Sequence, residues 1–245
     1  MRLFAIGDIH GCATALDVIL AAICLRTGDK VVGLGDYINK GPATKAVLDR
    51  LIQLFDRGFL IPLLGNHELK LLEAGRINQT RTGAGVLVDA HTLDSYGSDR
   101  EAKGLACIPD EHWKFVQEGC LNWFTSEQHI FVHATLDADK PLSDQSNQAL
   151  FWDKFIDPQP HLSGKTMICG HTPQRDGRPI NLGHAVCLDT AACEGHWLTC
   201  LEVNSGQIWQ ANQRGQLRIS NIKDYYGLQK DAPAGKSTAQ NLILV

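Results

Sequence analysis

The sequence predicts an α/β fold built around a parallel sheet, and three observations support this prediction. Over the first third of the chain, short apolar runs typical of buried strands alternate with segments whose apolar residues recur at helical spacing. Each of the first three runs ends at a glycine followed by a polar residue, as a strand does where it enters a loop. Strands that alternate with helices are joined by right-handed crossovers, which place the strands parallel to one another.

Three strand–helix pairs open the chain. The predicted strands cover Met1–Gly7, Lys30–Leu34 and Phe59–Leu64. The first helix is predicted from apolar residues at helical spacing, namely Leu16, Ile19, Leu20 and Ile23. The second has Pro42 in its first turn and its apolar face at Val47, Leu51, Leu54 and Phe55. A third helix is expected from Glu68 to Leu72.

The rest of the chain is predicted to contain a weakly periodic segment, then further strands, and finally a polar tail. From Gly75 to Asn122 the periodicity is weak, and we expect inserted helices and loops. Strands return at Ile130–His133, Thr166–Gly170, Ala185–Asp189, Trp197–Val203 and Gln207–Gln210, with a hairpin signal between the last two. The polar stretch Lys230–Gln240 predicts a mobile tail, so we expect one domain over residues 1–222 and a tail over residues 223–245.

Composition narrows the class of protein. The 245 residues are 44% hydrophobic and 20% charged, which is ordinary for a globular domain, and the net charge is −4. The sequence has no basic cluster of the kind that binds a nucleic-acid backbone and no apolar run near the roughly 18 residues of a membrane span. The eight cysteines form no C-x-x-C pair, and Asp8 interrupts the first apolar run too early for a signal peptide. Reduced thiols and a cytoplasmic location are therefore expected.

Metal-competent side chains follow five of the predicted strands. They are Asp8 and His10, then Asp36, then Asn66 and His67, then His133, and finally His171. Ligand sites in α/β folds lie beyond the carboxyl ends of the parallel strands, so these side chains are expected to share one crevice. Carboxylate, amide and imidazole donors suit Mn²⁺, Fe²⁺ or Zn²⁺, and one shared carboxylate can bridge two ions.

The motifs that hold these residues resemble a known family. They are Gly7-Asp8-Ile9-His10-Gly11, Gly35-Asp36-x-x-x-x-Gly41, Gly65-Asn66-His67-Glu68, Val132-His133-Ala134 and Gly170-His171-Thr172. In this order they resemble the phosphoprotein phosphatase family of calcineurin-like metallophosphoesterases, above all its bacterial and bacteriophage members. Further matches occur at Thr92–Gly97, Ile108-Pro109, Phe151-Trp152 and Leu188–Ala191, and the resemblance covers roughly residues 1–205.

The resemblance implies a four-layer α/β-β/α sandwich with mixed sheets and a centre of two divalent metal ions. By motif position, Asp8 and His10 would hold the first ion, Asp36 would bridge, and Asn66, His133 and His171 would hold the second. His67 would be the general acid, while a hydroxide that bridges the two ions attacks phosphorus in line. Manganese is the expected metal, with iron or zinc as alternatives. Asn66 is also expected to contact the substrate.

Three residues depart from the family pattern. Two of them, Asn39 and Lys40, lie in Gly35–Gly41, where the family reads Gly-Asp-x-Val-Asp-Arg-Gly, and the third, Lys154, follows Phe151-Trp152. Asn39 replaces an aspartate that supports positive charge on the catalytic histidine. Its amide oxygen can still accept a hydrogen bond from His67, but it supplies no countercharge. Lys40 and Lys154 replace the arginines of the phosphate clamp, and lysine binds phosphate as a point charge. Weaker positioning of phosphate, or a substrate of different shape, is expected.

Other residues near the motifs are interpreted as structural. We expect Glu68 to be a helix N-terminal charge rather than a ligand, and Cys12 to be a small residue at a helix start. Arg76 and Arg81 are interpreted as solvated charges, with compensation for the missing arginines as the alternative. For Trp152, a place in the pocket wall and a place in the core remain alternatives.

The sequence therefore predicts a cytoplasmic, metal-dependent phosphomonoesterase that acts on phosphorylated Ser, Thr or Tyr side chains. The expected partner is a phosphoprotein or phosphopeptide, with neither a nucleic acid nor a membrane; the oligomeric state is left open. Two alternatives remain. Hydrolases of dinucleoside tetraphosphates share the metal motifs, and a non-catalytic module that binds phosphate would account for Asn39, Lys40 and Lys154.

Overall fold

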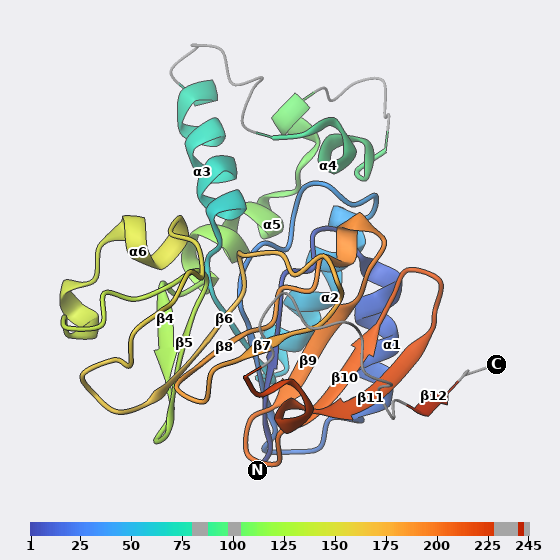
Figure 1. Ribbon diagram of the computed structural model, residues 1–245. Helices are drawn as coiled ribbons and strands as arrows, with labels where there is room; N and C mark the ends of the chain where they lie inside the picture. The colour runs from blue at the N-terminus through green and yellow to red at the C-terminus, as the bar shows by residue number, and fades with distance from the viewer. Residues whose placement is uncertain (80–87, 98–103, 228–239, 243–245) are drawn as a thin grey trace.

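Two mixed β-sheets lie at the centre of the protein, with helices around them (Figure 1). The computed structural model describes residues 1–79, 88–97, 104–227 and 240–242. The seven-stranded sheet has the order β12-β11-β10-β9-β1-β2-β3, and the five-stranded sheet has the order β4-β5-β6-β8-β7. The predicted mixed α/β architecture with two mixed sheets is confirmed.

The described elements have the following bounds. The helices are α1 (Ala13–Ile23), α2 (Thr44–Asp56), α3 (Asn66–Gln79), α4 (Ala90–Asp94), α5 (Asp110–Lys114) and α6 (Asn147–Phe151). The strands are β1 (Leu3–Ile6), β2 (Lys30–Gly33), β3 (Leu60–Pro62), β4 (Trp123–Thr125), β5 (His129–Val132), β6 (Thr166–Cys169), β7 (Ile180–Asn181), β8 (Ala185–Cys187), β9 (Leu198–Glu202), β10 (Gln207–Ala211), β11 (Leu217–Asn221) and β12 (Gln240–Leu242).

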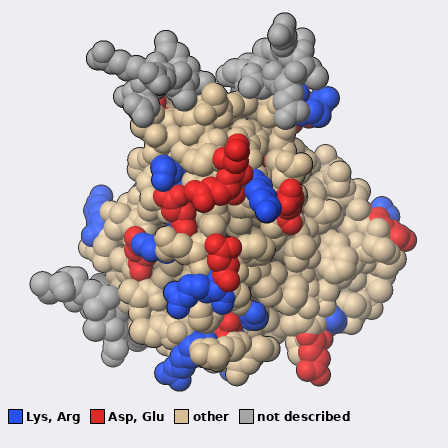
Figure 2. Space-filling model, turned by 180° about the vertical axis from the view of Figure 1, so that it is seen from behind, with Lys and Arg blue, Asp and Glu red and all other residues tan. Residues whose placement is uncertain are grey.

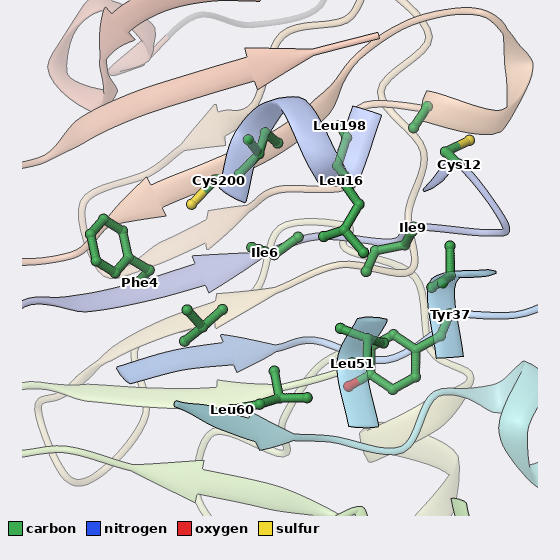
Figure 3. Packing of buried hydrophobic residues seen from close by; sticks show 14 of the residues in the cluster. Phe4, Ile6, Ile9, Cys12, Leu16, Tyr37, Leu51, Leu60, Leu198 and Cys200 are labelled. Atoms are coloured by element: carbon green, nitrogen blue, oxygen red, sulfur yellow. The ribbon is translucent and has the colours of Figure 1, made fainter. Parts of the chain in front are cut away.

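Alternate residues of β1, an interior strand of the seven-stranded sheet, belong to two different hydrophobic cores. Phe4 and Ile6 of β1 join the cluster that includes Leu16 of α1 and Leu51 of α2 (Figure 3). The intervening residues of β1 belong to a second cluster that contains residues of both sheets, Leu3 and Ala5 among them, with Phe131 and Ile168 opposite. Because side chains alternate along a strand, a strand covered on both faces is apolar throughout. This explains why the first strands were recognisable as continuous apolar runs.

Strand direction brings the predicted site together. β1 is parallel to β2 and β2 to β3, as predicted, while β9 joins β1 in the antiparallel sense. In the other sheet β5, β6 and β8 are parallel. The segments that directly follow β1, β2, β3, β5 and β6, including the start of α3, carry all the predicted metal-competent residues.

Several elements differ from the sequence prediction. α3 covers Asn66–Gln79 and is longer than expected, and Pro42 precedes α2, whose N-cap is Ala43. β11 was not predicted, because its residues are mostly half-buried and form no apolar run. Where the weakly periodic middle segment is described, it contains the end of α3, the helices α4 and α5, and loops between them. Residues 228–239 of the predicted tail lie outside the described residues, Gln240–Leu242 pairs with β11, and the boundary at residue 222 stays a prediction.

The described surface shows no strong bias of charge on the face in Figure 2, where acidic and basic side chains are intermixed. None of the described helices combines the length and the apolar character that crossing a membrane requires.

Arg2 and Asp29 tie the start of β1 to the loop before β2. Arg2 Nη2 lies 2.5 Å from Asp29 Oδ2, and the backbone amides of Arg2 and Arg26 also donate to this carboxylate. The Arg2 guanidinium, above all, holds the pKa of Asp29 well below its usual range. Asp29→Asn is expected to lower the free energy of unfolding by about 1–3 kcal/mol at pH 7.

The pH dependence of this effect provides the check. A carboxyl group with a depressed pKa stabilises the fold above its unfolded pKa of about 4, and the stabilisation is lost as the pH falls through the folded value. In urea denaturation, the difference between Asp29→Asn and the parent should therefore be smaller at pH 3 than at pH 7. An equal difference at both values would contradict the prediction.

Candidate metal centre

The predicted residues converge at one end of the two sheets. Asp8 and His10 follow β1, Asp36 follows β2, Asn66 and His67 begin α3, His133 follows β5, and His171 follows β6. All except His67, whose side chain is 15% exposed, are buried. A buried group of carboxylate, amide and imidazole side chains needs compensation, because burial of charged and polar groups is costly.

Asp36 lies between two groups of candidate ligands. Its Oδ2 is 3.4 Å from His10 Nε2, and its Oδ1 is 3.4 Å from His133 Nε2. One group joins Asp36 to His10 and His67, and the other joins it to His133 and His171, with all ligand atoms of each group within 4.8 Å of one another. Each oxygen of Asp36 thus faces a different group, which is the arrangement of a carboxylate that bridges two cations.

Backbone carbonyls orient three of the histidines. His10 Nδ1 is 2.8 Å from the Ile38 oxygen, His133 Nδ1 is 2.8 Å from the Leu34 oxygen, and His171 Nε2 is 3.0 Å from the Trp152 oxygen. In each ring the N–H donates to the carbonyl, so the other nitrogen presents its lone pair to the site. Metal-binding histidines are usually oriented in this way.

Asn66 provides a test of whether a cation fits. Its Oδ1 lies 3.1–3.3 Å from His133 Nε2, His171 Nδ1 and both oxygens of Asp36. Electron-pair donors therefore face one another with no hydrogen between them. Either the amide turns its nitrogen inward, or a cation lies among these atoms, and a divalent ion satisfies all of them at once. The residues present fit such a centre.

Asp8 lies beside two further carboxylates. It accepts the backbone N–H of His171 at 3.0 and 3.1 Å. Burial, together with the charges of Asp189 and Asp36, raises the pKa of Asp8 well above its usual value. Burial likewise raises the pKa of Asp36 and of Asp189 to about 6. Asp189 had no assigned role, and its position here adds to the negative charge that divalent ions would neutralise.

The Asn39–His67 hydrogen bond runs opposite to the sequence expectation. Asn39 Nδ2, not its oxygen, lies 2.9 Å from His67 Nδ1. The amide oxygen is already occupied, because it accepts the Thr92 hydroxyl at 2.9 Å and the Asp89 N–H at 3.4 Å. Asn39 therefore donates to Nδ1, which leaves the His67 proton on Nε2. Burial, with the charges of Lys70 and Lys40, lowers the pKa of His67 to about 3, so the ring is a neutral donor.

Three lysines surround the two ligand groups. Lys40 Nζ is 2.8 Å from His10 Nε2, and Lys154 Nζ is 3.2 Å from His171 Nε2. Lys70 on α3 was not singled out in the sequence, yet its charge acts on Asp36 and His67 together with that of Lys40. These cations supply point charges around the site rather than the bidentate fork of arginine.

Glu68 has a role that sequence reasoning missed. It is fully buried, and its carboxylate accepts the backbone N–H groups of Gly65, Asp36, Tyr37 and Ile38 at 2.7–3.3 Å. Burial, followed by the charge of Asp36, raises the pKa of Glu68, while the hydrogen bonds from the backbone of Tyr37, Asp36 and Gly65 favour the charged carboxylate and oppose this rise. Glu68 thus holds the Asp36 loop against the start of α3 and is not directed at the ligand groups. Its position in the Gly-Asn-His-Glu motif was the one feature of the sequence that could have indicated this role.

The remaining candidates are less central. Arg76 forms an ion pair with Glu73 on the exposed side of α3, and Arg81 lies outside the described residues. Cys12 is buried, and burial raises the pKa of its thiol to about 12, in keeping with a structural role. Trp152 is 38% exposed and so is not a core residue.

Backbone strain marks the same loops. Eight described non-glycine residues have a positive φ, of 44–68°: six are His10, Asp36, Asn39, Lys40, His171 and Ala191, in or next to the motifs, and the other two are Cys24 and Asp157. Such conformations cost on the order of 1–3 kcal/mol each and cluster at functional sites. Close approach also requires glycine in these loops: for example, a Cβ at Gly170 would lie 2.0 Å from Asp8 Oδ1, and one at Gly65 would lie 2.2 Å from Asp36 Oδ1.

Comparison with known proteins agrees with this geometry. Residues 1–197 match the model of the calcineurin-like phosphoesterase family. The chain belongs to this family. The expectation of a calcineurin-like metallophosphoesterase, a hydrolase of phosphate compounds, is thereby confirmed, and the ligand groups agree with the divalent metals typical of the family.

Two similar relatives carry the same name. A symmetrical bis(5'-nucleosyl)-tetraphosphatase of Janthinobacterium sp. (strain Marseille) is 24% identical over 98% of this chain and 100% of that protein. That of Acidovorax sp. (strain JS42) is 47% identical over 75 residues, which are 30% of this chain and 26% of the relative.

Solved structures show the same fold with different names. A candidate diadenosine tetraphosphatase has a TM-score of 0.63 at 21% identity, over 86% of this chain and 92% of that one. A cold-active protein-tyrosine phosphatase of Shewanella sp. has a TM-score of 0.64 at 16% identity, over 89% and 80% of the two chains. At these identities the similarity establishes the fold alone.

Asn39→Asp is expected to reverse the polarity of the hydrogen bond to His67. A carboxylate next to Nδ1 accepts rather than donates, and its charge favours the imidazolium, so the pKa of His67 should rise by about one unit or more. The limb of the pH–rate profile that reports His67 should move to higher pH by the same amount. Asn204→Asp, at an exposed hairpin turn, is the matched control and should leave the profile unchanged.

Proposed function

We propose that this protein hydrolyses dinucleoside tetraphosphates symmetrically, in a reaction that depends on divalent metal ions. Water would cleave the central phosphoanhydride bond, and the products would be two nucleoside diphosphates. The similarity to a symmetrical bis(5'-nucleosyl)-tetraphosphatase along nearly the whole length of both chains supports this substrate class. It is the alternative of the sequence interpretation, and we prefer it to phosphoproteins.

The direction of the Asn39–His67 hydrogen bond carries the proposal. A serine or threonine alkoxide is a poor leaving group and needs a strong proton donor. The phosphate released from an anhydride is weakly basic, with a second pKa of about 6, and a hydrogen bond from a neutral donor suffices. His67 is such a donor, because Asn39 Nδ2 occupies its Nδ1 at 2.9 Å and, within the part of the chain that the structure describes, no carboxylate pairs with that nitrogen. The site therefore suits an anhydride better than an ester.

The chain's own residues divide the work as follows. Asp8, His10 and Asp36 would hold one divalent ion, and Asp36, Asn66, His133 and His171 the other. When bound, these ions would act as Lewis acids on the phosphoryl oxygens and lower the pKa of water. His67 would hold its proton at Nε2, which is 3.9 Å from Asp36 Oδ2, and donate a hydrogen bond, without losing the proton, to the weakly basic leaving phosphate. Lys40 and Lys154 would neutralise further charge of the tetraphosphate.

The metal-stripped protein, titrated with Mn²⁺, Fe²⁺ or Zn²⁺, should be assayed with diadenosine tetraphosphate, with Ser, Thr and Tyr phosphopeptides, and with p-nitrophenyl phosphate. We expect kcat/KM for the dinucleotide to exceed that for phosphopeptides by about 100-fold or more. ADP should be the sole nucleotide product. A higher kcat/KM for phosphopeptides would instead support a phosphoprotein phosphatase. Metal binding without turnover of any of these substrates would indicate a non-catalytic module that binds phosphate.

A further inference from the structure

Lys70 occupies a position at the site that no step above uses. It lies on α3 one turn beyond Asn66 and His67, so it shares their side of the helix. Its Nζ is 5.4 Å from the centre of the Trp152 ring. Among the described residues its ammonium forms no ion pair, and its charge acts on both Asp36 and His67. An unpaired ammonium beside the ligand groups is free to bind an anion.

Trp152 presents an aromatic ring beside this ammonium. The residue directly follows α6 and is 38% exposed, which is unusual for so large an apolar side chain. Its backbone is fixed from two sides, because its carbonyl accepts His171 Nε2–H at 3.0 Å and its amide donates to Gln148 at 3.0 Å. The backbone that carries the exposed ring is therefore held at a set place relative to His171.

A second place near the site is a hollow whose charge is mostly negative. It has a volume of about 450 Å³, and its wall includes Lys154 together with four aspartates, Asp137, Asp139, Asp153 and Asp157. Carboxylates repel a polyphosphate chain, so this hollow does not suit the leaving half of the substrate. Lys70 and Trp152 offer the opposite character, a cation beside an aromatic surface.

We propose that Lys70 and Trp152 form a subsite for the leaving nucleoside diphosphate, in which Lys70 binds its phosphates and the Trp152 ring stacks on its base. The inference rests on the proposed function, whose substrate has a nucleoside at each end. An ammonium binds phosphate as a point charge, and an aromatic ring stacks on any base. The subsite explains why an exposed tryptophan is anchored to a residue of the ligand groups.

The test measures inhibition of p-nitrophenyl phosphate hydrolysis by ADP and by inorganic pyrophosphate, with free Mn²⁺ held constant. Trp152→Leu should raise the inhibition constant of ADP about tenfold and leave that of pyrophosphate within about twofold, because only ADP has a base. Lys70→Met should weaken both inhibitors about tenfold. Trp152→Phe retains a ring and should restore most of the ADP binding. Lys114→Met, on the exposed side of α5, is the matched control and should change neither constant.

The outcomes separate this inference from the proposed function. Equal ADP inhibition in Trp152→Leu and the parent, or equal weakening of both inhibitors by Trp152→Leu, would overturn the subsite. If the parent does not hydrolyse diadenosine tetraphosphate but the two inhibitors respond as expected, the proposed function fails and the nucleotide subsite stands. If the parent hydrolyses diadenosine tetraphosphate but neither Trp152→Leu nor Lys70→Met changes the two inhibition constants, the proposed function stands and the nucleotide subsite fails.

Discussion

Glu68→Gln is expected to lower both stability and activity, although Glu68 touches neither metal nor substrate in the proposed mechanism. Oε2 accepts the amides of Asp36 and Gly65 at 2.7 and 2.9 Å, and Oε1 accepts those of Tyr37 and Ile38 at 2.8 and 3.3 Å. Glutamine has one oxygen and one NH₂ group, so two of these four buried amides must lose their acceptor. The loss in unfolding free energy should be roughly 2–6 kcal/mol, at about 1–3 kcal/mol for each unsatisfied donor.

The effect on activity follows from geometry. The same amides set the position of Asp36, and a displacement of about 1 Å at a reacting centre can cost about 100-fold in rate. We expect kcat/KM to fall by about that factor, measured beside urea denaturation. The matched control is Glu118→Gln, whose side chain is exposed. Parent-like stability and activity in Glu68→Gln would show that the four hydrogen bonds do not hold the Asp36 loop.

The position of the candidate site was predictable because each of its side chains comes immediately after a strand. Chain order therefore determined spatial order: β1, β2 and β3 are parallel neighbours, and whatever follows them must meet at one edge. The same reasoning failed for β11, because its residues are mostly half-buried and a strand that is not covered on both faces needs no continuous apolar run.

The roles within the site were less predictable, because they depend on partners far away in the chain. The direction of the Asn39 amide is determined by Thr92 and Asp89, which are 53 and 50 residues distant, and no local pattern reports them. A glutamate at the start of a helix can interact with the helix dipole, bind a metal ion or hold a neighbouring loop, and its residue type alone does not distinguish these roles for Glu68. Lys70 on a helix resembles any solvated lysine until Trp152 is placed beside it.

Asp36→Asn should have opposite effects on stability with and without metal. Burial raises the pKa of Asp36 to about 6, against about 4 in the unfolded chain. Ionisation of this carboxyl therefore destabilises the metal-free fold, and the penalty grows as the pH rises from about 4 to 6 and is constant above. At pH 7.5 the metal-free variant should be more stable than the parent by on the order of 2 kcal/mol.

Metal should reverse that order. The parent gains about 2.7 kcal/mol for each site at an ion concentration 100 times Kd. The variant lacks the charge shared by the two ligand groups, and one of its amide atoms turns N–H toward His10 or His133, so it should lose most of this gain. Its kcat/KM should fall by at least about 10³-fold, because several kcal/mol of transition-state stabilisation depend on the ions. Thermal unfolding with and without Mn²⁺ measures the reversal, and Asp56→Asn at the exposed end of α2 is the control. A variant that is less stable than the parent by the same amount in both conditions would mean that Asp36 serves the fold and not the ions.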